Sequence, residues 1–184
     1  MVTNRATWKW QQQQHPGARP FKGPLGRITG QARPAHQAEP SVGLVSGGGG
    51  NLAPGLYRLI AIHSNKCFDV SGVSRNNGAI IHQWKCNNGG NQKWTLSYNG
   101  GDAMLTAQHS NLVASVHNAS TLNGVDFVQW SNQNGAHQKF RITFSNGGYK
   151  IVNVKSGKCV DVSGAGKHNG ARIVQVICII LNLK

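Results

Sequence analysis

The sequence contains few acidic residues, few charges of any kind and no long hydrophobic run. Five Asp and Glu stand against 19 Lys and Arg, so the formal net charge is +14. Charged residues make up 13% of the chain, roughly half of the usual share. The longest apolar run, residues 176–181, is far shorter than the ~18 residues of a membrane-spanning helix. These shortages exclude a membrane span and a coiled coil, and they favour a turn-rich, all-β domain.

The beginning of the chain lacks the basic start and apolar stretch of a secretory signal. Residues 1–50 instead contain four consecutive Gln at 11–14, five of the six prolines and a Gly run at 47–50. Such a composition buries too little apolar surface to offset ordering entropy, so we predict a disordered, basic tail and linker. Trp8 and Trp10 are then either stray aromatics or a docking motif.

From residue 51 onward, short apolar runs alternate with Asn-Gly and Gly-Gly turns, a pattern typical of β-strands. No stretch keeps a helical period of 3.6 residues. The expected strands cover residues 56–62, 79–84, 104–107, 125–130, 140–144, 149–154 and 172–176.

This region contains an internal repeat with a step of 46 residues. Asn-Gly pairs begin at positions 77, 123 and 169, and Gln83-Trp84 recurs as Gln129-Trp130. Residues 64–72 recur at 156–164, two steps later. We therefore predict one pseudo-threefold all-β domain over residues 51–184, with copies at about 52–98, 99–144 and 145–184.

The four cysteines follow the same repeat. Cys67 and Cys86 are 19 residues apart, as are Cys159 and Cys178, whereas copy two lacks both members of the pair. Paired loss is what a disulfide requires, and the short Cys-x-x-Cys spacing of a zinc site is absent. The spacing predicts two disulfides and hence an oxidising, secreted or extracellular location.

Taken together, these motifs resemble the ricin-B-type lectins, which are β-trefoil carbohydrate-binding domains marked by Gln-x-Trp repeats. The similar segments are Cys67-x-Asp69-Val70, residues 78–86 with Gln83-Trp84, and Asn91-Gln92-Lys93-Trp94, and the resemblance covers about 52–184. It implies a six-stranded barrel capped by three hairpins, with one shallow, metal-free sugar site possible in each copy.

In copy one, the resemblance implies a complete sugar-binding set. Asp69 is the hydroxyl-binding carboxylate, Trp84 the stacking ring and Asn91 the amide, while His82 and Gln92 occupy neighbouring polar positions of the site. A pyranose offers an apolar C–H face to a ring and hydroxyls to a carboxylate or an amide. The alternatives are that Trp84 is a core aromatic and that Asp69 caps a turn.

Copies two and three are degenerate. Copy two has Ser115 in place of the carboxylate, although Trp130 remains. Copy three keeps Asp161 but has Val176 in place of the ring, and its third structural Trp would be residue 186, beyond the sequence. The incomplete third copy is therefore expected to leave an unpaired barrel edge.

These features predict a non-catalytic module that binds galactose- or xylose-type sugars through copy one, without cofactor or metal, and that targets a catalytic or toxin domain of a longer parent protein to glycans. The domain has four scattered Asp and no paired carboxylates or nucleophile signature, which argues against an enzyme. The alternative is a basic β-trefoil that binds sulfated glycans or other polyanions. Against this alternative, the basic residues are spread through the copies rather than clustered. No specific nucleic-acid partner is indicated.

Overall fold

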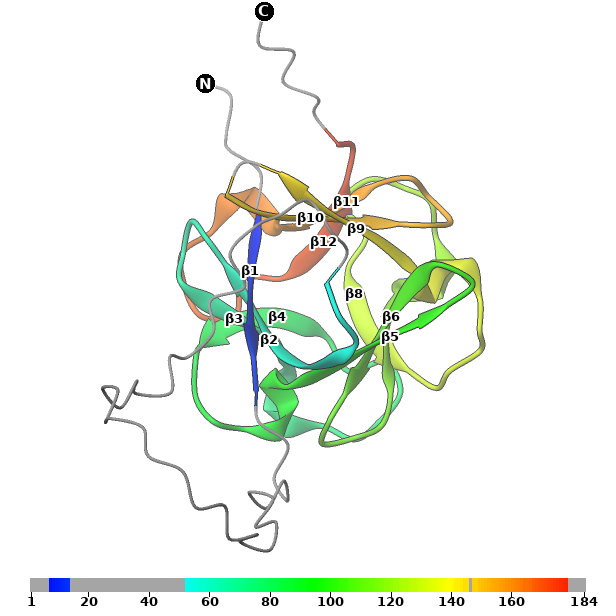
Figure 1. The fold of residues 1–184 in the computed structure, drawn as a ribbon. Helices are drawn as coiled ribbons and strands as arrows, with labels where there is room; N and C mark the ends of the chain where they lie inside the picture. Colours follow the sequence, from blue (N-terminus) through cyan, green and yellow to red (C-terminus); the bar gives the residue numbers. More distant parts are fainter. Residues whose placement is uncertain (1–6, 14–51, 146, 179–184) are drawn as a thin grey trace, which may run out of the picture.

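The computed structural model describes residues 7–13, 52–145 and 147–178 (Figure 1). These residues form a 12-stranded sheet and five single 3-10 turns, and none of the described helices could span a membrane. The strands are β1 (Trp8–Gln12), β2 (Gly55–Ala61), β3 (Lys66–Val70), β4 (Ile81–Lys85), β5 (Trp94–Asn99), β6 (Asp102–Ala107), β7 (Val113–Val116), β8 (Phe127–Trp130), β9 (Phe140–Ser145), β10 (Gly148–Asn153), β11 (Cys159–Val162) and β12 (Ile173–Val176). The 3-10 turns are η1 (Ser71–Val73), η2 (Gly90–Gln92), η3 (His117–Ala119), η4 (Ala136–Gln138) and η5 (Ser163–Ala165).

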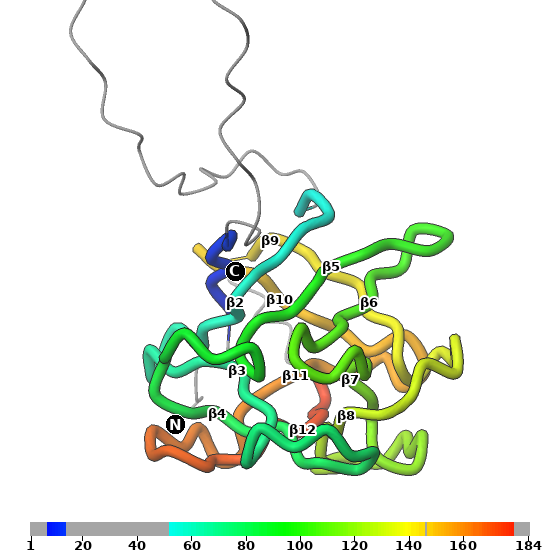
Figure 2. Tube along the Cα trace, turned by 90° about the horizontal axis from the view of Figure 1, so that it is seen from below, coloured from blue at the N-terminus to red at the C-terminus, as the bar shows by residue number. Residues whose placement is uncertain are grey.

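Six strands close into a barrel. Antiparallel pairing runs from β1 to β2, β5, β6, β9 and β10, and then from β10 back to β1. The hairpins β3–β4, β7–β8 and β11–β12 lie together below the barrel strands in Figure 2. This architecture confirms the prediction of an all-β, β-trefoil fold with three copies.

The strand that closes the barrel comes from the beginning of the chain. β1 pairs with β2 over five residues, and Trp8 also pairs with Tyr149 of β10 (Figure 1). The expectation that Trp8 and Trp10 lie in a disordered tail is therefore wrong for residues 7–13. The rest of the expected tail, residues 1–6 and 14–50 including the linker at 46–50, lies outside the described residues.

Trp8 occupies the place expected for the missing third structural Trp. Its indole Nε1 donates to the carbonyl of Val160 at 3.2 Å, as Nε1 of Trp94 donates to the carbonyl of Phe68 at 3.1 Å. Val160 and Phe68 are equivalent positions, two repeat steps apart. The predicted unpaired barrel edge is therefore absent among the described strands. Trp8 fills the core position of the missing aromatic, and the backbone of β1 pairs with β2 and β10.

The copies are held together by a repeated glutamine contact. Gln83, Gln129 and Gln175 are each fully buried, and each accepts a hydrogen bond from a Ser hydroxyl of its own copy. Their amide groups each donate to two backbone carbonyls of a neighbouring copy, for example from Gln129 to Ser74 and Asn76. The repeated Gln therefore joins neighbouring copies, and the Asn-Gly turns beside it place Gly78, Gly124 and Gly170 at positive φ, where glycine is favoured.

Both predicted disulfides are present. Cys67 bonds to Cys86 and Cys159 to Cys178, with Cα atoms 5.1 Å apart in each pair. Each bond ties the beginning of one hairpin strand to the segment that follows the next strand.

Removing one disulfide is expected to destabilise the domain measurably. Each closes a loop with a sequence separation of 19, worth about 3 kcal/mol in the chain-entropy model. Urea unfolding of the Cys159→Ala/Cys178→Ala double variant should show a loss of that size. Because the copy-one site lies in the hairpin β3–β4 and this disulfide lies in copy three, sugar affinity should be unchanged. A loss of sugar affinity in the double variant would show that the site depends on the copy-three disulfide.

Candidate functional site

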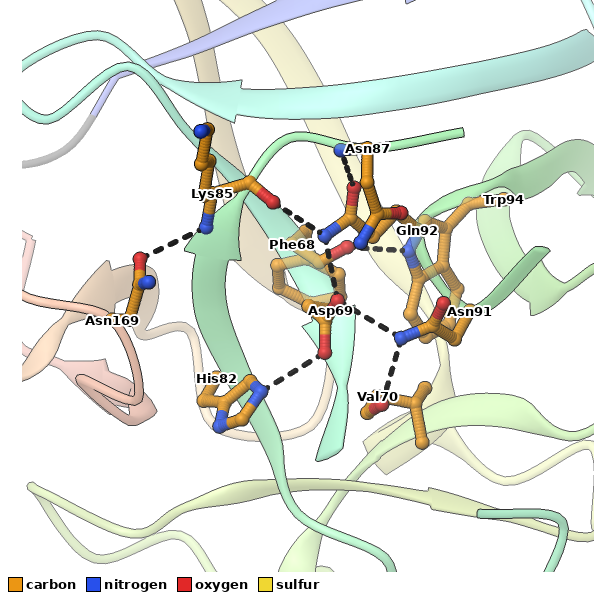
Figure 3. A network of polar contacts seen from close by, with 10 residues as sticks. All are labelled: Phe68, Asp69, Val70, His82, Lys85, Asn87, Asn91, Gln92, Trp94 and Asn169. Carbon is orange, nitrogen blue, oxygen red and sulfur yellow. Dashed lines mark hydrogen bonds and ion pairs between the residues drawn. The ribbon is translucent and has the colours of Figure 1, made fainter. Parts of the chain in front are cut away.

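The hairpin of copy one and the turn η2 bring the predicted site residues together. Asp69 of β3 pairs directly with His82 of β4, and Trp84 lies two residues further along β4. Side chains two residues apart on a strand share a face, so His82 and Trp84 point the same way. The turn η2 then brings Asn91 and Gln92 to the same place (Figure 3).

Asp69 lies at the centre of this arrangement and is only 3% exposed. Its Oδ1 accepts a bond from Nε2 of His82 at 2.9 Å. Its Oδ2 accepts bonds from Nδ2 of Asn91 at 2.9 Å and from Nε2 of Gln92 at 2.7 Å (Figure 3). A carboxylate offers about four lone-pair sites, so three protein bonds leave room for about one further donor.

Asn91 supports the carboxylate and also offers an acceptor to a ligand. Both hydrogens of its amide nitrogen are used, by Asp69 and by the carbonyl of Val70 at 3.1 Å. Only Oδ1 remains, so Asn91 can accept from a sugar hydroxyl but cannot donate to one. Gly89 is needed beside it, because a Cβ at that position would lie 2.5 Å from this Oδ1.

Gln92 lies behind the site rather than in it. Its side chain is fully buried, its Nε2 donates to Asp69 and to the carbonyl of Lys85, and its Oε1 accepts from the backbone N–H of Asn87. With its amide engaged in this way, Gln92 positions Asp69.

Trp84 and His82 form the aromatic part of the site. The two rings stack with centroids 5.3 Å apart and an interplanar angle of 21°. Trp84 is 41% exposed, which excludes the alternative that it is a core aromatic. His82 bonds to Asp69 through Nε2, so Nδ1 is the ring nitrogen that this bond does not use.

These side chains line a cavity of about 600 Å³. Its remaining walls come from η1 and from the loop before η2, at positions that the sequence analysis did not single out: Ser71, Gly72, Val73, Asn87, Asn88 and Gly89. One of them carries a signal in the sequence. Val73 is a branched residue, whereas the equivalent residues of copies two and three, Ala119 and Ala165, are alanines.

The equivalent place in copy two is smaller and lacks the carboxylate. Its cavity of about 190 Å³ is lined by Trp130, Ser115, Val128 and His137, among others. Ser115 is buried and donates to the carbonyl of Val116 at 3.4 Å. Burial, and secondarily the charge of Lys155, lowers the pKa of His137, which favours its neutral form.

In copy three, Asp161 stands at the position of Asp69. Oδ1 of Asp161 accepts from the backbone N–H of Val162 at 2.7 Å, and the aromatic position is Val176 of β12. The positions of the Asn and Gln, Leu183 and Lys184, lie outside the described residues. Across residues 7–13, 52–145 and 147–178, no cluster of three or more His, Cys, Asp or Glu has the geometry to hold a metal ion.

Comparison with known proteins agrees with this geometry. The family model described as "Ricin-type beta-trefoil lectin domain-like" matches residues 45–104 and 90–176. A designed threefold-symmetric protein, ThreeFoil, is 36% identical, with 67% of this chain and 90% of that chain covered and a TM-score of 0.66. A search of curated proteins gives no match.

Two natural proteins share the fold. The exo-β-1,3-galactanase 1,3Gal43A from Clostridium thermocellum is 30% identical over 67% of this chain, with a TM-score of 0.65, and the match covers only 27% of that enzyme. The ricin B-like lectin of Macrolepiota procera, solved in complex with lactose, is 17% identical, with 71% and 92% of the two chains covered and a TM-score of 0.61. The family match over more than half of the chain and the closed barrel with its three hairpins lead to one conclusion: the chain belongs to the ricin-type β-trefoil lectin domain family, whose fold is a carbohydrate-binding one.

Proposed function

We propose that this protein is a non-catalytic carbohydrate-binding domain with one sugar site, in copy one. The observation that carries the proposal is the buried carboxylate of Asp69, held by three side-chain donors beside the exposed ring of Trp84. A sugar can stack its C–H face on the ring while one hydroxyl donates to Asp69 and another to Oδ1 of Asn91. Because the carboxylate is already fixed, binding requires little reordering of the protein.

The sugar is expected to be of galactose or xylose type. Oligomers of β-1,3-linked galactose are the first candidates, because the galactanase 1,3Gal43A is 30% identical to this chain. The match covers only part of that enzyme, which supports a role in directing an attached catalytic or toxin domain to glycans. The two disulfides support a secreted or extracellular setting for this role.

A binding role is also favoured over catalysis by the placement of the acidic side chains. Asp69 is paired with His82, Asp102 lies 3.7 Å from Arg141, and Asp126 lies 2.8 Å from Arg172. Glycoside hydrolysis uses two carboxyls that face one bond. Three of the four described carboxylates, those of Asp69, Asp102 and Asp126, each have a different basic partner.

Calorimetric titration of the full chain tests the proposal. The ligands are methyl β-galactoside, β-1,3-galactobiose, xylobiose and heparin, each at 50 and 500 mM salt. A single shallow site should bind one sugar per chain in the millimolar range, near −4 kcal/mol, with little dependence on salt. Two or three sugars per chain would show that copy two or three also binds.

The competing function is polyanion binding, which the net charge of +14 favours. In that case heparin alone would bind, and its affinity would fall steeply between the two salt concentrations as counterion release weakens. That result would overturn the proposal of a neutral-sugar site.

A further inference from the structure

A branched side chain in copy one adopts a backbone conformation that branched residues avoid. Val73, the last residue of η1, has a φ of +53°, in the left-handed region. Two heavy atoms on Cβ crowd the backbone there, so a valine in this region is a genuine outlier. Such strain persists only where the surrounding structure imposes it.

The repeat imposes this conformation at all three equivalent positions. The corresponding residues of copies two and three are Ala119 and Ala165, with φ of +51° and +52°. After Val73, the carbonyl of Ser74 accepts a bond from the buried side chain of Gln129 at 2.7 Å, which fixes the turn from the neighbouring copy. The turn therefore requires left-handed backbone, and only copy one places a branched residue in it.

Nothing in the core accounts for the valine. Its side chain is 56% exposed, so the branch gains little from burial. Val73 and Trp84 are both among the exposed large apolar side chains of the described residues, and both line the cavity of copy one. A strained apolar side chain at the rim of a binding cavity points to a ligand contact.

We propose that Val73 is a specificity-determining residue that contacts a second sugar unit, next to the unit bound by Asp69 and Trp84. This inference rests on the proposed function. The cavity of about 600 Å³ is of the size that holds drug-sized ligands, and it exceeds the 190 Å³ of the copy-two cavity. The isopropyl group of Val73 offers an apolar surface to the C–H groups of the second pyranose.

The test compares Val73→Ala with the native chain on two ligands, methyl β-galactoside and β-1,3-galactobiose, and repeats the comparison with xylose and xylotriose. Affinity for the oligosaccharide that the native chain binds should fall about threefold to tenfold, because apolar contact is lost. Affinity for the corresponding monosaccharide should stay unchanged. The melting temperature should rise by about 2–4 °C, because alanine relieves the strain.

Ala165→Val is the matched control. It places the same branched residue in the same turn of copy three, away from the copy-one cavity. It should lower the melting temperature without changing affinity for either ligand.

The outcomes separate this inference from the proposed function. If the native chain binds none of the four sugars, the proposed function itself fails, while the two melting temperatures still test the strain. If the native chain binds and Val73→Ala leaves oligosaccharide affinity unchanged, or weakens both ligands equally, the role of Val73 is overturned. An unchanged melting temperature in both variants would overturn the argument from strain.

Discussion

Alanine in place of Trp8 is expected to lower the free energy of unfolding by about 3–5 kcal/mol, the usual range for removing a fully buried large aromatic. The Trp8 side chain has no exposed area, packs edge-on against Phe68 at 5.5 Å and donates to the carbonyl of Val160. Its removal leaves a cavity in the core and a buried acceptor without its donor. The loss is measured by urea denaturation, with unfolding monitored by far-ultraviolet circular dichroism rather than by tryptophan fluorescence.

Two neighbouring positions on β1 serve as controls. Lys9→Ala should change stability by less than about 0.5 kcal/mol, because that side chain is exposed. The loss of stability in Trp10→Ala should lie between those of Trp8→Ala and Lys9→Ala, since Trp10 is half-buried and packs against Tyr57 and Tyr149. Deleting residues 1–13 should prevent stable folding, because it leaves β2 and β10 without their shared partner. Native stability after that deletion would show that β1 is dispensable.

The second large effect is expected on binding. Trp84→Ala should weaken sugar binding at least about tenfold, or ~1.4 kcal/mol, which places a millimolar site below detection. Since the ring is 41% exposed, its loss should have little effect on the melting temperature. Calorimetry against β-1,3-galactobiose and xylotriose measures the change.

Trp130→Ala in copy two is the matched control for Trp84→Ala. Both rings occupy the same place in their hairpins, but Ser115 replaces the carboxylate beside Trp130. Removing Trp130 should leave the affinity and the stoichiometry of sugar binding unchanged. Equal losses in the two variants would indicate that copy two binds as well.

Asp69 is a less selective target than Trp84. The sequence alone suggests that Asp69→Ala would abolish binding and spare the fold. However, the carboxylate is buried and accepts from His82, Asn91 and Gln92. Alanine would leave one N–H of each buried amide, Asn91 and Gln92, without its acceptor and would remove the partner of His82, so this variant would lose stability together with binding.

In the sequence, Asp69 and His82 are grouped into one candidate site by the resemblance to the ricin-B-type lectins. The structure brings their side chains within hydrogen-bonding distance, because the two residues lie directly opposite each other on β3 and β4. The sequence could not show which polar groups are already used. The engaged amide of Gln92 and the single remaining acceptor of Asn91 depend on burial and hydrogen-bond geometry.

The closing strand was missed for a different reason. Trp8 lacks the Gln that stands two residues before Trp94 and Phe140, so no motif marked it as a third copy of that position. Its one local signal is the alternation Trp8-x-Trp10, which is similar to Trp94-x-Leu96, although Trp10 is only half-buried whereas Leu96 is buried. Tertiary packing, rather than local composition, makes this segment a strand.

The position of β1 before the other described strands also has a kinetic consequence. β1 is synthesised before β2 to β12, yet the indole of its Trp8 bonds to a residue 152 positions later in the sequence. Contacts of such high sequence separation slow folding, because loop-closure entropy is lost before the contact forms. During synthesis the indole of Trp8 therefore lacks this acceptor until the chain has been made as far as Val160, and the barrel cannot close before then.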